Sequence, residues 1–211
     1  MLTLKQIAPK YSERMAVIGQ TGTGKSTLVK HILPVYKSLC VIDPKRTFEY
    51  PDIPIFDNPA SIEKSKPIRF IYRPKPSLLD NLSAYDRVLK YCYLKRNIMI
   101  FIDDVVGIIP RFNPPPYLKV CYQMGRERNV GVIACFQRPS GVPMVLMTEA
   151  NTFCVFRLTR KDDIKRVQEY VPTYNPEELP DKYTFFVYNP DTIDYPVKCK
   201  LSLTKETGIN A

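Results

Sequence analysis

The chain has 211 residues, of which 45% are hydrophobic and 25% charged, and its formal net charge is +10. This length fits a single domain, and the apolar fraction excludes a wholly disordered chain. No stretch approaches the ~20 apolar residues of a membrane span, and the six cysteines lack the close spacing of a zinc cluster. We therefore expect a soluble intracellular protein whose basic charge suits a polyanionic partner.

Apolar runs alternate with helical patterns along most of the chain, which predicts a three-layer α/β domain with a mostly parallel central sheet. Two later runs, 183–188 and 197–203, are joined by Asn189-Pro190-Asp191 and predict a hairpin at the sheet edge. We expect one domain, with its core at about 14–170 and a C-terminal strand extension at about 181–204. The expected strands of the core are 15–19, 39–43, 68–72, 98–102, 130–136 and 152–158, and its expected helices are 25–33, 78–92, 117–124 and 161–170.

A glycine-rich loop lies between the first expected strand and the first expected helix. Such a loop can point successive N–H groups at phosphate oxygens, and the following helix adds its positive N-terminus. Lys25 can reach the β- and γ-phosphates and Ser26 can ligate Mg²⁺, so we predict a site for ATP with Mg²⁺. The loop fits G-x-x-x-x-G-K-[ST] without a mismatch, and its residues are Gly19, Gln20, Thr21, Gly22, Thr23, Gly24, Lys25, Ser26 and Thr27.

Two carboxylates follow the apolar strand 98–102. This is the Walker B pattern, in which Asp103 holds Mg²⁺ beside the phosphate loop. A buried strand with a solvated acidic end is the alternative, and the phosphate loop upstream favours the functional interpretation. Asp104 occupies the position from which a carboxylate can orient the attacking water. A contact to the magnesium shell is the other role open to Asp104.

Gln137 ends the expected strand 130–136, so its amide reaches the same sheet edge, where it can contact the γ-phosphate or water. Just before this strand, Arg126 and Arg128 lie near a helix end. Arginine is suited to clamping a transferring phosphoryl group, either in cis or from a neighbouring subunit. A solvated basic helix end is the alternative interpretation.

Five segments together resemble the FtsK/HerA superfamily of P-loop motor ATPases, and within it the small genome-packaging ATPases of tailless viruses with an internal membrane. The phosphate loop is common to many proteins, whereas the strand followed by Asp43-Pro44-Lys45 and the strand end at Gln137-Arg138-Pro139 are more specific. The segments are GQTGTGKST at 19–27, VIDPKRTFE at 41–49, IMIFIDD at 98–104, GRERNVGVIACFQRPSGVP at 125–143 and EANTFCVFRLTRKDD at 149–163.

The resemblance implies a RecA/ASCE-like P-loop fold and ATP-driven translocation of double-stranded DNA into a preformed capsid, without sequence preference. It also implies a homo-oligomeric ring, expected to be a hexamer, in the cytoplasm of the host cell or at a virion vertex. A capsid-vertex or membrane-anchored protein would dock the motor. Asp104 departs from the family, where many relatives have Glu, so its role is open. The implied roles are phosphate and magnesium binding for Lys25 and Ser26, the Walker B acid for Asp103, the strand-end Gln for Gln137, and the finger for Arg126 or else Arg128.

Three basic clusters suit a DNA partner, at 64–75, 87–96 and 157–166, although a solvated face is the commoner reason for such clusters. The loop 105–117 follows Asp103 and Asp104 and carries Arg111 and Phe112, so we expect it to contact DNA. A stiff connector is its alternative.

Other functions share this phosphate loop. Plasmid or conjugative DNA transfer and virion-assembly ATPases of the same superfamily are the nearer alternatives. A small-molecule kinase is the more distant one, because no segment reads clearly as an acceptor site or a lid.

Overall fold

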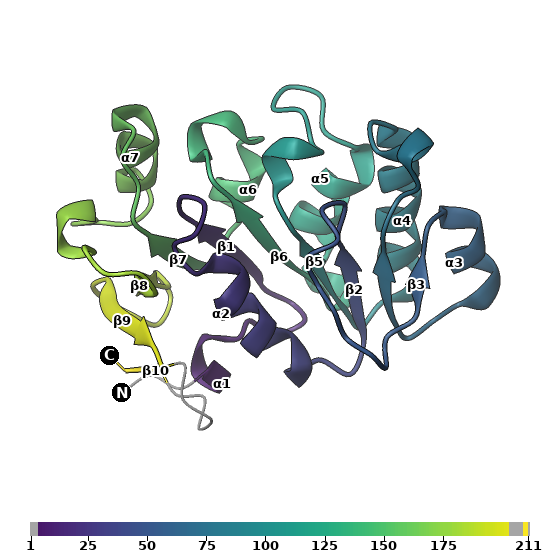
Figure 1. Cartoon of the computed structure of the whole chain (residues 1–211), viewed down its shortest axis with the longest axis horizontal. Helices are drawn as coiled ribbons and strands as arrows, with labels where there is room; N and C mark the ends of the chain where they lie inside the picture. The colour runs from purple at the N-terminus through teal and green to yellow at the C-terminus, as the bar shows by residue number, and fades with distance from the viewer. Residues whose placement is uncertain (1–3, 203–208, 211) are drawn as a thin grey trace.

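The computed structural model describes residues 4–202 and 209–210. Within them, ten strands form one sheet in the order β10-β9-β8-β7-β1-β6-β5-β2-β4-β3 (Figure 1). From β7 to β3 every neighbouring pair is parallel, whereas β8, β9 and β10 are added antiparallel. The strands are β1 (Arg14–Ile18), β2 (Leu39–Ile42), β3 (Ile55–Phe56), β4 (Arg69–Tyr72), β5 (Ile98–Ile102), β6 (Val130–Phe136), β7 (Thr152–Phe156), β8 (Thr184–Tyr188), β9 (Val197–Leu201) and β10 (Ile209–Asn210).

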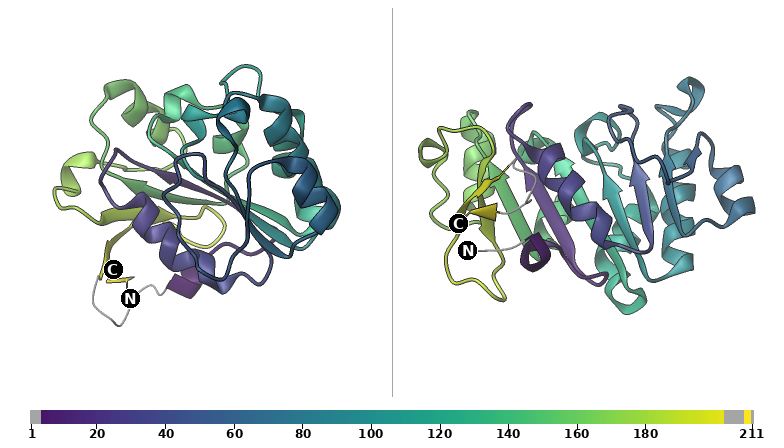
Figure 2. Two further views of the ribbon diagram at one scale, coloured as in Figure 1. Left: turned by 45° about the vertical axis from the view of Figure 1, so that its right-hand side comes forward. Right: turned by 60° about the horizontal axis from the view of Figure 1, so that its bottom comes forward.

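Helices cover both faces of this sheet, which makes three layers (Figure 2). One face carries α1 (Leu4–Ile7) and α2 (Lys25–Ile32). The other carries α3 (Pro59–Ser65), α4 (Leu82–Lys95), α5 (Pro116–Met124), α6 (Val145–Thr148) and α7 (Lys161–Gln168). None of the helices in the described residues is long and apolar enough to span a membrane.

Side chains along the central strands point alternately to the two faces of the sheet, so each strand contributes to two hydrophobic cores. Ile98, Ile100 and Ile102 of β5 belong to the core under α4 and α5, whereas Met99 and Phe101 belong to the core under α2. All five side chains are fully buried. Burial of each is worth about 1.5–3 kcal/mol. A shift of β5 by one residue would exchange these side chains between the two cores, so the position of the strand and of its end is strongly fixed.

The expected elements of the core and the C-terminal hairpin are present, with shifted ends. The helix expected from 78 begins at Leu82, because the Asn81 side chain accepts a hydrogen bond from Ala84 N–H at 3.1 Å and caps it there. The strand expected to reach 158 ends at Phe156. Positions 203 and 204, the end of the expected extension, lie outside the described residues. The sequence did not predict β3 or α3, which are short and lie in a proline-rich stretch.

The parallel strands give the sheet two distinct edges. At the carboxyl edge, Gly19, Asp43, Asp103 and Gln137 directly follow β1, β2, β5 and β6. At the amino edge lie the residues that precede or open these strands, among them Arg14 of β1. Side chains that are distant in sequence therefore meet at one edge, which is where ligands bind in open α/β sheets.

Candidate nucleotide site

The phosphate loop between β1 and α2 has a backbone that only glycine readily adopts. Gly22 and Gly24 have φ angles of +80° and +119°, in the left-handed region. A Cβ on Gly24 would lie 2.7 Å from Cδ1 of Tyr183, and a Cβ on Gly19 would lie 2.5 Å from Cβ of Phe156. Backbone conformation and close packing both exclude a larger residue at Gly24, as expected for a loop that curls around a phosphate.

Lys25 opens α2 with its ammonium folded back over this loop. Its Nζ donates hydrogen bonds to the carbonyl oxygens of Gly19 at 2.7 Å and Gln20 at 2.8 Å. The residue is 9% exposed, and burial lowers the pKa of its ammonium. A phosphate bound at the loop would compensate for the lost hydration of the ammonium by pairing with it, so the site favours an anionic ligand.

Asp103 lies at the end of β5 and is 6% exposed. Its Oδ2 accepts a hydrogen bond from Thr47 Oγ1 at 3.2 Å. Burial raises the pKa of this carboxyl, and the neighbouring carboxylates of Asp43 and Asp104 act in the same direction. Among the described residues the Asp103 carboxylate accepts this one hydrogen bond, to Oδ2, so Oδ1 is available to a cation. Oxygen atoms are the ligands that Mg²⁺ prefers, so Asp103 and the Ser26 hydroxyl at the start of α2 are the residues that could hold it.

Asp43 supports this carboxylate from the end of β2. It is fully buried and accepts hydrogen bonds from Thr47 N–H at 2.9 Å and Phe48 N–H at 3.1 Å. Arg73, which follows β4, neutralises it through Nε at 3.0 Å. The conformation of the loop after β2 is thereby fixed, and Thr47 is directed at Asp103. Nothing in the local sequence around Thr47 or Arg73 predicts a role in the site.

Asp104 has a left-handed backbone, with φ of +55°, and its side chain is 15% exposed. It forms an ion pair with Lys45 from the loop after β2. The carboxylate that was expected to orient water is therefore held beside the site by a cation. Its role in hydrolysis stays a prediction.

Gln137 reaches the phosphate loop, as its position after β6 predicts. Its Oε1 accepts a hydrogen bond from Thr21 Oγ1 at 2.8 Å, and Gln20 donates to the hydroxyl of Thr159. A hollow of about 320 Å³ opens here, and it joins the loop to the residues after β6 and β7. Its lining residues are Gln20, Thr21, Gln137, Arg138, Leu158, Thr159, Arg160 and Asp163.

A second, smaller hollow of about 170 Å³ lies on the other side of the loop, at the start of α2. Tyr183, just before β8, forms one wall, and its N–H donates to the Thr23 carbonyl at 2.9 Å. The Lys182 ammonium lies 5.0 Å from the centre of the Tyr183 ring. An aromatic ring beside the phosphate loop suits the base of a nucleotide, because every base has a face that stacks. Tyr183 and Lys182 were missed, because no local motif marks them.

Arg126 and Arg128 do not join this site. They form a short 3₁₀ turn before β6, at the amino edge, so neither reaches the phosphate loop of its own chain. The Arg128 guanidinium lies 4.5 Å from the Tyr93 ring centre. Arg126 instead lines a polar hollow of about 390 Å³ together with Arg14 and Glu149. The cis alternative therefore does not fit the fold, and a finger role requires a neighbouring subunit.

Known proteins resemble this chain in sequence and in fold. No family model matches the chain. The DNA packaging ATPase P9 of Enterobacteria phage PRD1 is 26% identical over 176 residues, which cover 78% of this chain and 72% of that protein. The genome packaging NTPase B204 of Sulfolobus turreted icosahedral virus 2, solved with sulfate, aligns with a TM-score of 0.74 and 16% identity over 89% of this chain and 96% of that one.

The chain is similar to viral genome-packaging ATPases. The expected P-loop fold is confirmed, and so is the resemblance drawn from the five segments. The pCW3 conjugation coupling protein TcpA also aligns, with a TM-score of 0.60 and 14% identity over 89% of this chain and 59% of that one. B204 has been solved with ATP-gammaS and with AMPPCP. The likeness to these solved structures is one of fold.

Proposed function

We propose that the chain is an ATP-hydrolysing motor that translocates double-stranded DNA and packages a viral genome. The observation that carries the proposal is the meeting of Lys25, Asp103 and Gln137 around one phosphate loop, in a chain similar to the packaging ATPases P9 and B204. The negative charges of Asp103 and Asp104 act to raise the pKa of the buried Lys25 ammonium, so the two carboxylates and Lys25 lie in one site.

Binding of ATP follows from the chain's own groups. The loop N–H groups, the N-terminus of α2 and Lys25 hold the phosphates, and Tyr183 stacks on the base. Mg²⁺, held by Ser26 and Asp103, would neutralise charge on the β- and γ-phosphates. Gln137, at the phosphate loop, is placed to hold the attacking water or to sense the γ-phosphate. Asp104, which follows Asp103 at the carboxyl edge, is the second candidate for holding the water, and its ion pair with Lys45 fixes its orientation.

A ring of subunits would complete the site. Arg126 is exposed at the amino edge and has no ion-pair partner among the described residues. In a ring, this edge of one subunit can face the carboxyl edge of the next, where a guanidinium would stabilise the transferring phosphoryl group. We infer a homo-oligomer, with a hexamer as the expected number.

DNA would meet the loop between β5 and α5, which projects from the sheet (Figure 1). Phe112 is 87% exposed at this loop, and the Arg111 guanidinium lies 5.0 Å from its ring centre. The loop begins directly after Asp103 and Asp104, so a change at the phosphates can reach it through a few residues. Charge and an aromatic tip suit backbone contacts without sequence preference. A docking protein at a capsid vertex or membrane would recruit the motor in the host cytoplasm or at the virion.

Conjugative or plasmid DNA transfer is the second candidate function, and the alignment with TcpA favours it. The chemistry and the DNA substrate class would be the same. The discriminating property is the partner that recruits the motor, a capsid vertex or a conjugation pore.

Steady-state ATP hydrolysis at high protein concentration, with and without long duplex DNA, tests the proposal. We expect DNA to stimulate hydrolysis and Lys25→Ala to reduce the rate by about 10²–10³-fold, since it removes a charge-stabilising donor. Lys30→Ala, an exposed lysine of the same helix, is the matched control. Hydrolysis indifferent to DNA, together with phosphorylation of a nucleoside or metabolite, would replace the motor with a kinase.

A further inference from the structure

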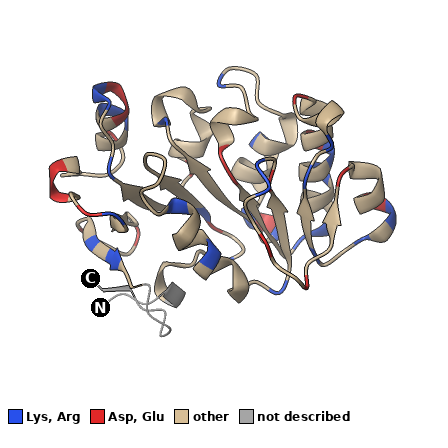
Figure 3. Cartoon of the chain, in the orientation of Figure 1, with Lys and Arg blue, Asp and Glu red and all other residues tan. Residues whose placement is uncertain are grey.

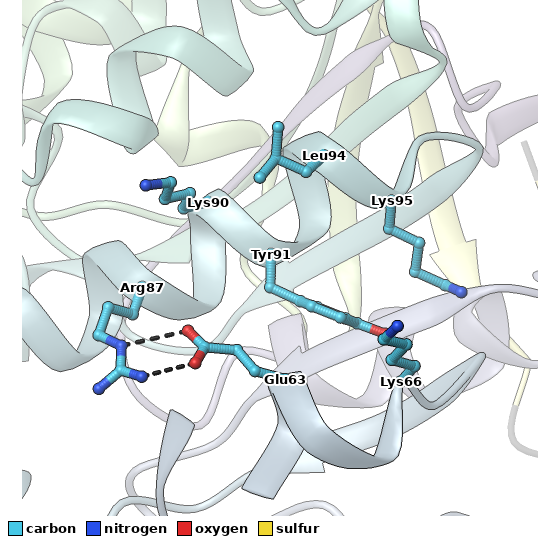
Figure 4. Close-up of a pocket in the computed structure, with 7 residues that line it drawn as sticks. All are labelled: Glu63, Lys66, Arg87, Lys90, Tyr91, Leu94 and Lys95. Carbon is cyan, nitrogen blue, oxygen red and sulfur yellow. Dashed lines mark hydrogen bonds and ion pairs between the residues drawn. The ribbon is translucent and has the colours of Figure 1, made fainter. Parts of the chain in front are cut away.

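Helices α3 and α4 enclose a groove that the nucleotide chemistry does not use. It has a volume of about 490 Å³. Apart from Glu63, its lining comes from two of the basic clusters seen in the sequence, 64–75 and 87–96, which the fold brings together across the two helices (Figure 3). We call it the α3/α4 groove, and its lining residues are Glu63, Lys66, Arg87, Lys90, Tyr91, Leu94 and Lys95 (Figure 4).

The floor of the α3/α4 groove is apolar and rigid. The Tyr91 ring packs edge-on against Phe70 at a centroid distance of 5.8 Å, and its hydroxyl donates to the Pro67 carbonyl at 3.1 Å. Leu94, one turn further along α4, is 57% exposed. A fixed aromatic ring beside an exposed leucine is a surface that gains from being covered by an apolar side chain.

The rim of the groove is left with unbalanced positive charge. Glu63 is the single carboxylate of the lining, and Arg87 neutralises it with two hydrogen bonds of 3.1 and 2.6 Å. Lys66, Lys90 and Lys95 have no ion-pair partner among the described residues. The Arg87–Glu63 pair ties α3 to α4. The Lys90 ammonium lies 5.7 Å from the Tyr117 ring centre, and all three lysines can still pair with an anionic partner.

We propose that the α3/α4 groove is the docking site for an acidic segment of a partner protein. The segment would place an apolar side chain on Tyr91 and Leu94, and its carboxylates would pair with Lys66, Lys90 and Lys95. The apolar floor decides between a peptide and DNA, because phosphate contacts in DNA complexes come from charged and polar groups and bury little apolar surface.

The groove lies apart from the chain's own nucleotide site. Lys66 precedes β4 and Lys95 precedes β5, so this end of the groove lies at the amino edge, away from Lys25 and Asp103 at the carboxyl edge. A bound segment therefore leaves the nucleotide site and the Phe112 loop open. The inference concerns binding alone and does not depend on ATP hydrolysis by the chain.

Fluorescence anisotropy with the full chain tests the proposal. The probe is a labelled peptide that alternates Asp and Glu with Leu and Phe, and a peptide with Asn and Gln in place of the acids measures the contribution of charge. A labelled DNA duplex is titrated in parallel. The variants are Lys66→Glu/Lys95→Glu and Leu94→Ser. The matched control is Lys119→Glu/Lys198→Glu, two exposed lysines outside the groove with the same change in net charge.

We expect Lys66→Glu/Lys95→Glu to weaken binding of the acidic peptide about tenfold or more, which corresponds to about 1.4 kcal/mol. Leu94→Ser should weaken it several-fold, and the control should bind normally. Equal loss in both charge variants would overturn the proposal in favour of general charge attraction. Loss of DNA affinity in the groove variant alone would make the groove a DNA surface. Loss of ring assembly by light scattering would assign it to a second copy of the chain. Circular dichroism and the thermal midpoint confirm that each variant is folded.

Discussion

The two edges of the parallel sheet differ in how far one chain satisfies its own charged groups. At the carboxyl edge, Asp43 is neutralised by Arg73, Asp104 by Lys45, and Asp103 accepts a hydrogen bond from Thr47. This edge is organised before any ligand arrives. The ordered arrangement is typical of a site whose catalytic groups must not reorganise during the reaction.

The amino edge is less complete. Arg14 is only 6% exposed, yet its Nε has no hydrogen-bond partner among the described residues, and burial lowers its pKa. Arg126 lies nearby in the same polar hollow and lowers the pKa of Arg14 further. The groups expected to bind nucleotide thus lie on one chain, and we propose that full hydrolysis also needs the amino edge of a neighbour.

The largest expected effect tests whether the amino edge of one subunit acts on the site of the next. Arg126→Ala should lower ATP hydrolysis by about 10³-fold or more, because an arginine finger supplies that much when it acts in trans. Mixing Arg126→Ala with Lys25→Ala protein should recover part of the activity, since one interface then has both intact halves. Arg128→Ala is the matched control, because Arg128 already packs on Tyr93. No recovery at any mixing ratio, with assembly intact, would count against a trans finger.

The ion pair at the carboxyl edge allows a second test. Asp104→Asn should lower kcat by about 10²-fold if its carboxylate orients the attacking water. Lys45→Ala should cost less, because it removes only the group that holds Asp104. Single-turnover rates of both variants and of the double variant decide the matter. Equal losses in the two single variants and in the double variant would show that Asp104 acts only by positioning Lys45.

A smaller effect is expected on the base side of the loop. Tyr183→Ala should raise KM for ATP about tenfold and leave kcat nearly unchanged, because stacking is present equally in the ground and transition states. Tyr183→Phe keeps the ring and should behave like the wild type. A fall in kcat with KM unchanged would instead place Tyr183 in the chemical step.

The smallest effect concerns the free energy of unfolding without nucleotide or magnesium. The raised pKa of Asp103 means that the folded state binds its proton more tightly than the unfolded state does. Its contribution to stability therefore falls as pH rises from the ordinary value of 3.8 through the raised pKa. Asp103→Asn should remove this dependence and raise the thermal midpoint at pH 7 by about 2 °C. Asp191→Asn, at an exposed carboxylate, is the control; a lower midpoint for Asp103→Asn would contradict the prediction.

Local sequence patterns predict one part of the candidate site. The phosphate loop has its own motif, and Asp103 and Gln137 each follow an apolar strand. Because parallel strands end at one edge, knowledge of the strands was enough to bring these residues together.

The parts that were missed depend on tertiary packing. Tyr183 reaches the loop only because β8 pairs with β7, which in turn pairs with β1. Thr47 is directed at Asp103 by hydrogen bonds to Asp43, which no spacing reveals. Likewise, the clusters 64–75 and 87–96 appeared in the sequence as separate basic stretches, suited to DNA or to solvent. Their contact across α3 and α4 could not be read before the helices were placed.

The hydrogen bond from Tyr183 N–H to the Thr23 carbonyl has a practical consequence. The Tyr183 carbonyl also accepts a hydrogen bond from Leu201 N–H at 3.0 Å, so backbone hydrogen bonds connect the phosphate loop directly to the start of β8 and to β9. A shift of the loop on entry or release of phosphates would be passed to the hairpin through these bonds. Tyr195, between β8 and β9, is 72% exposed. A dye attached there through a Tyr195→Cys substitution would report nucleotide occupancy from outside the pocket, in real time.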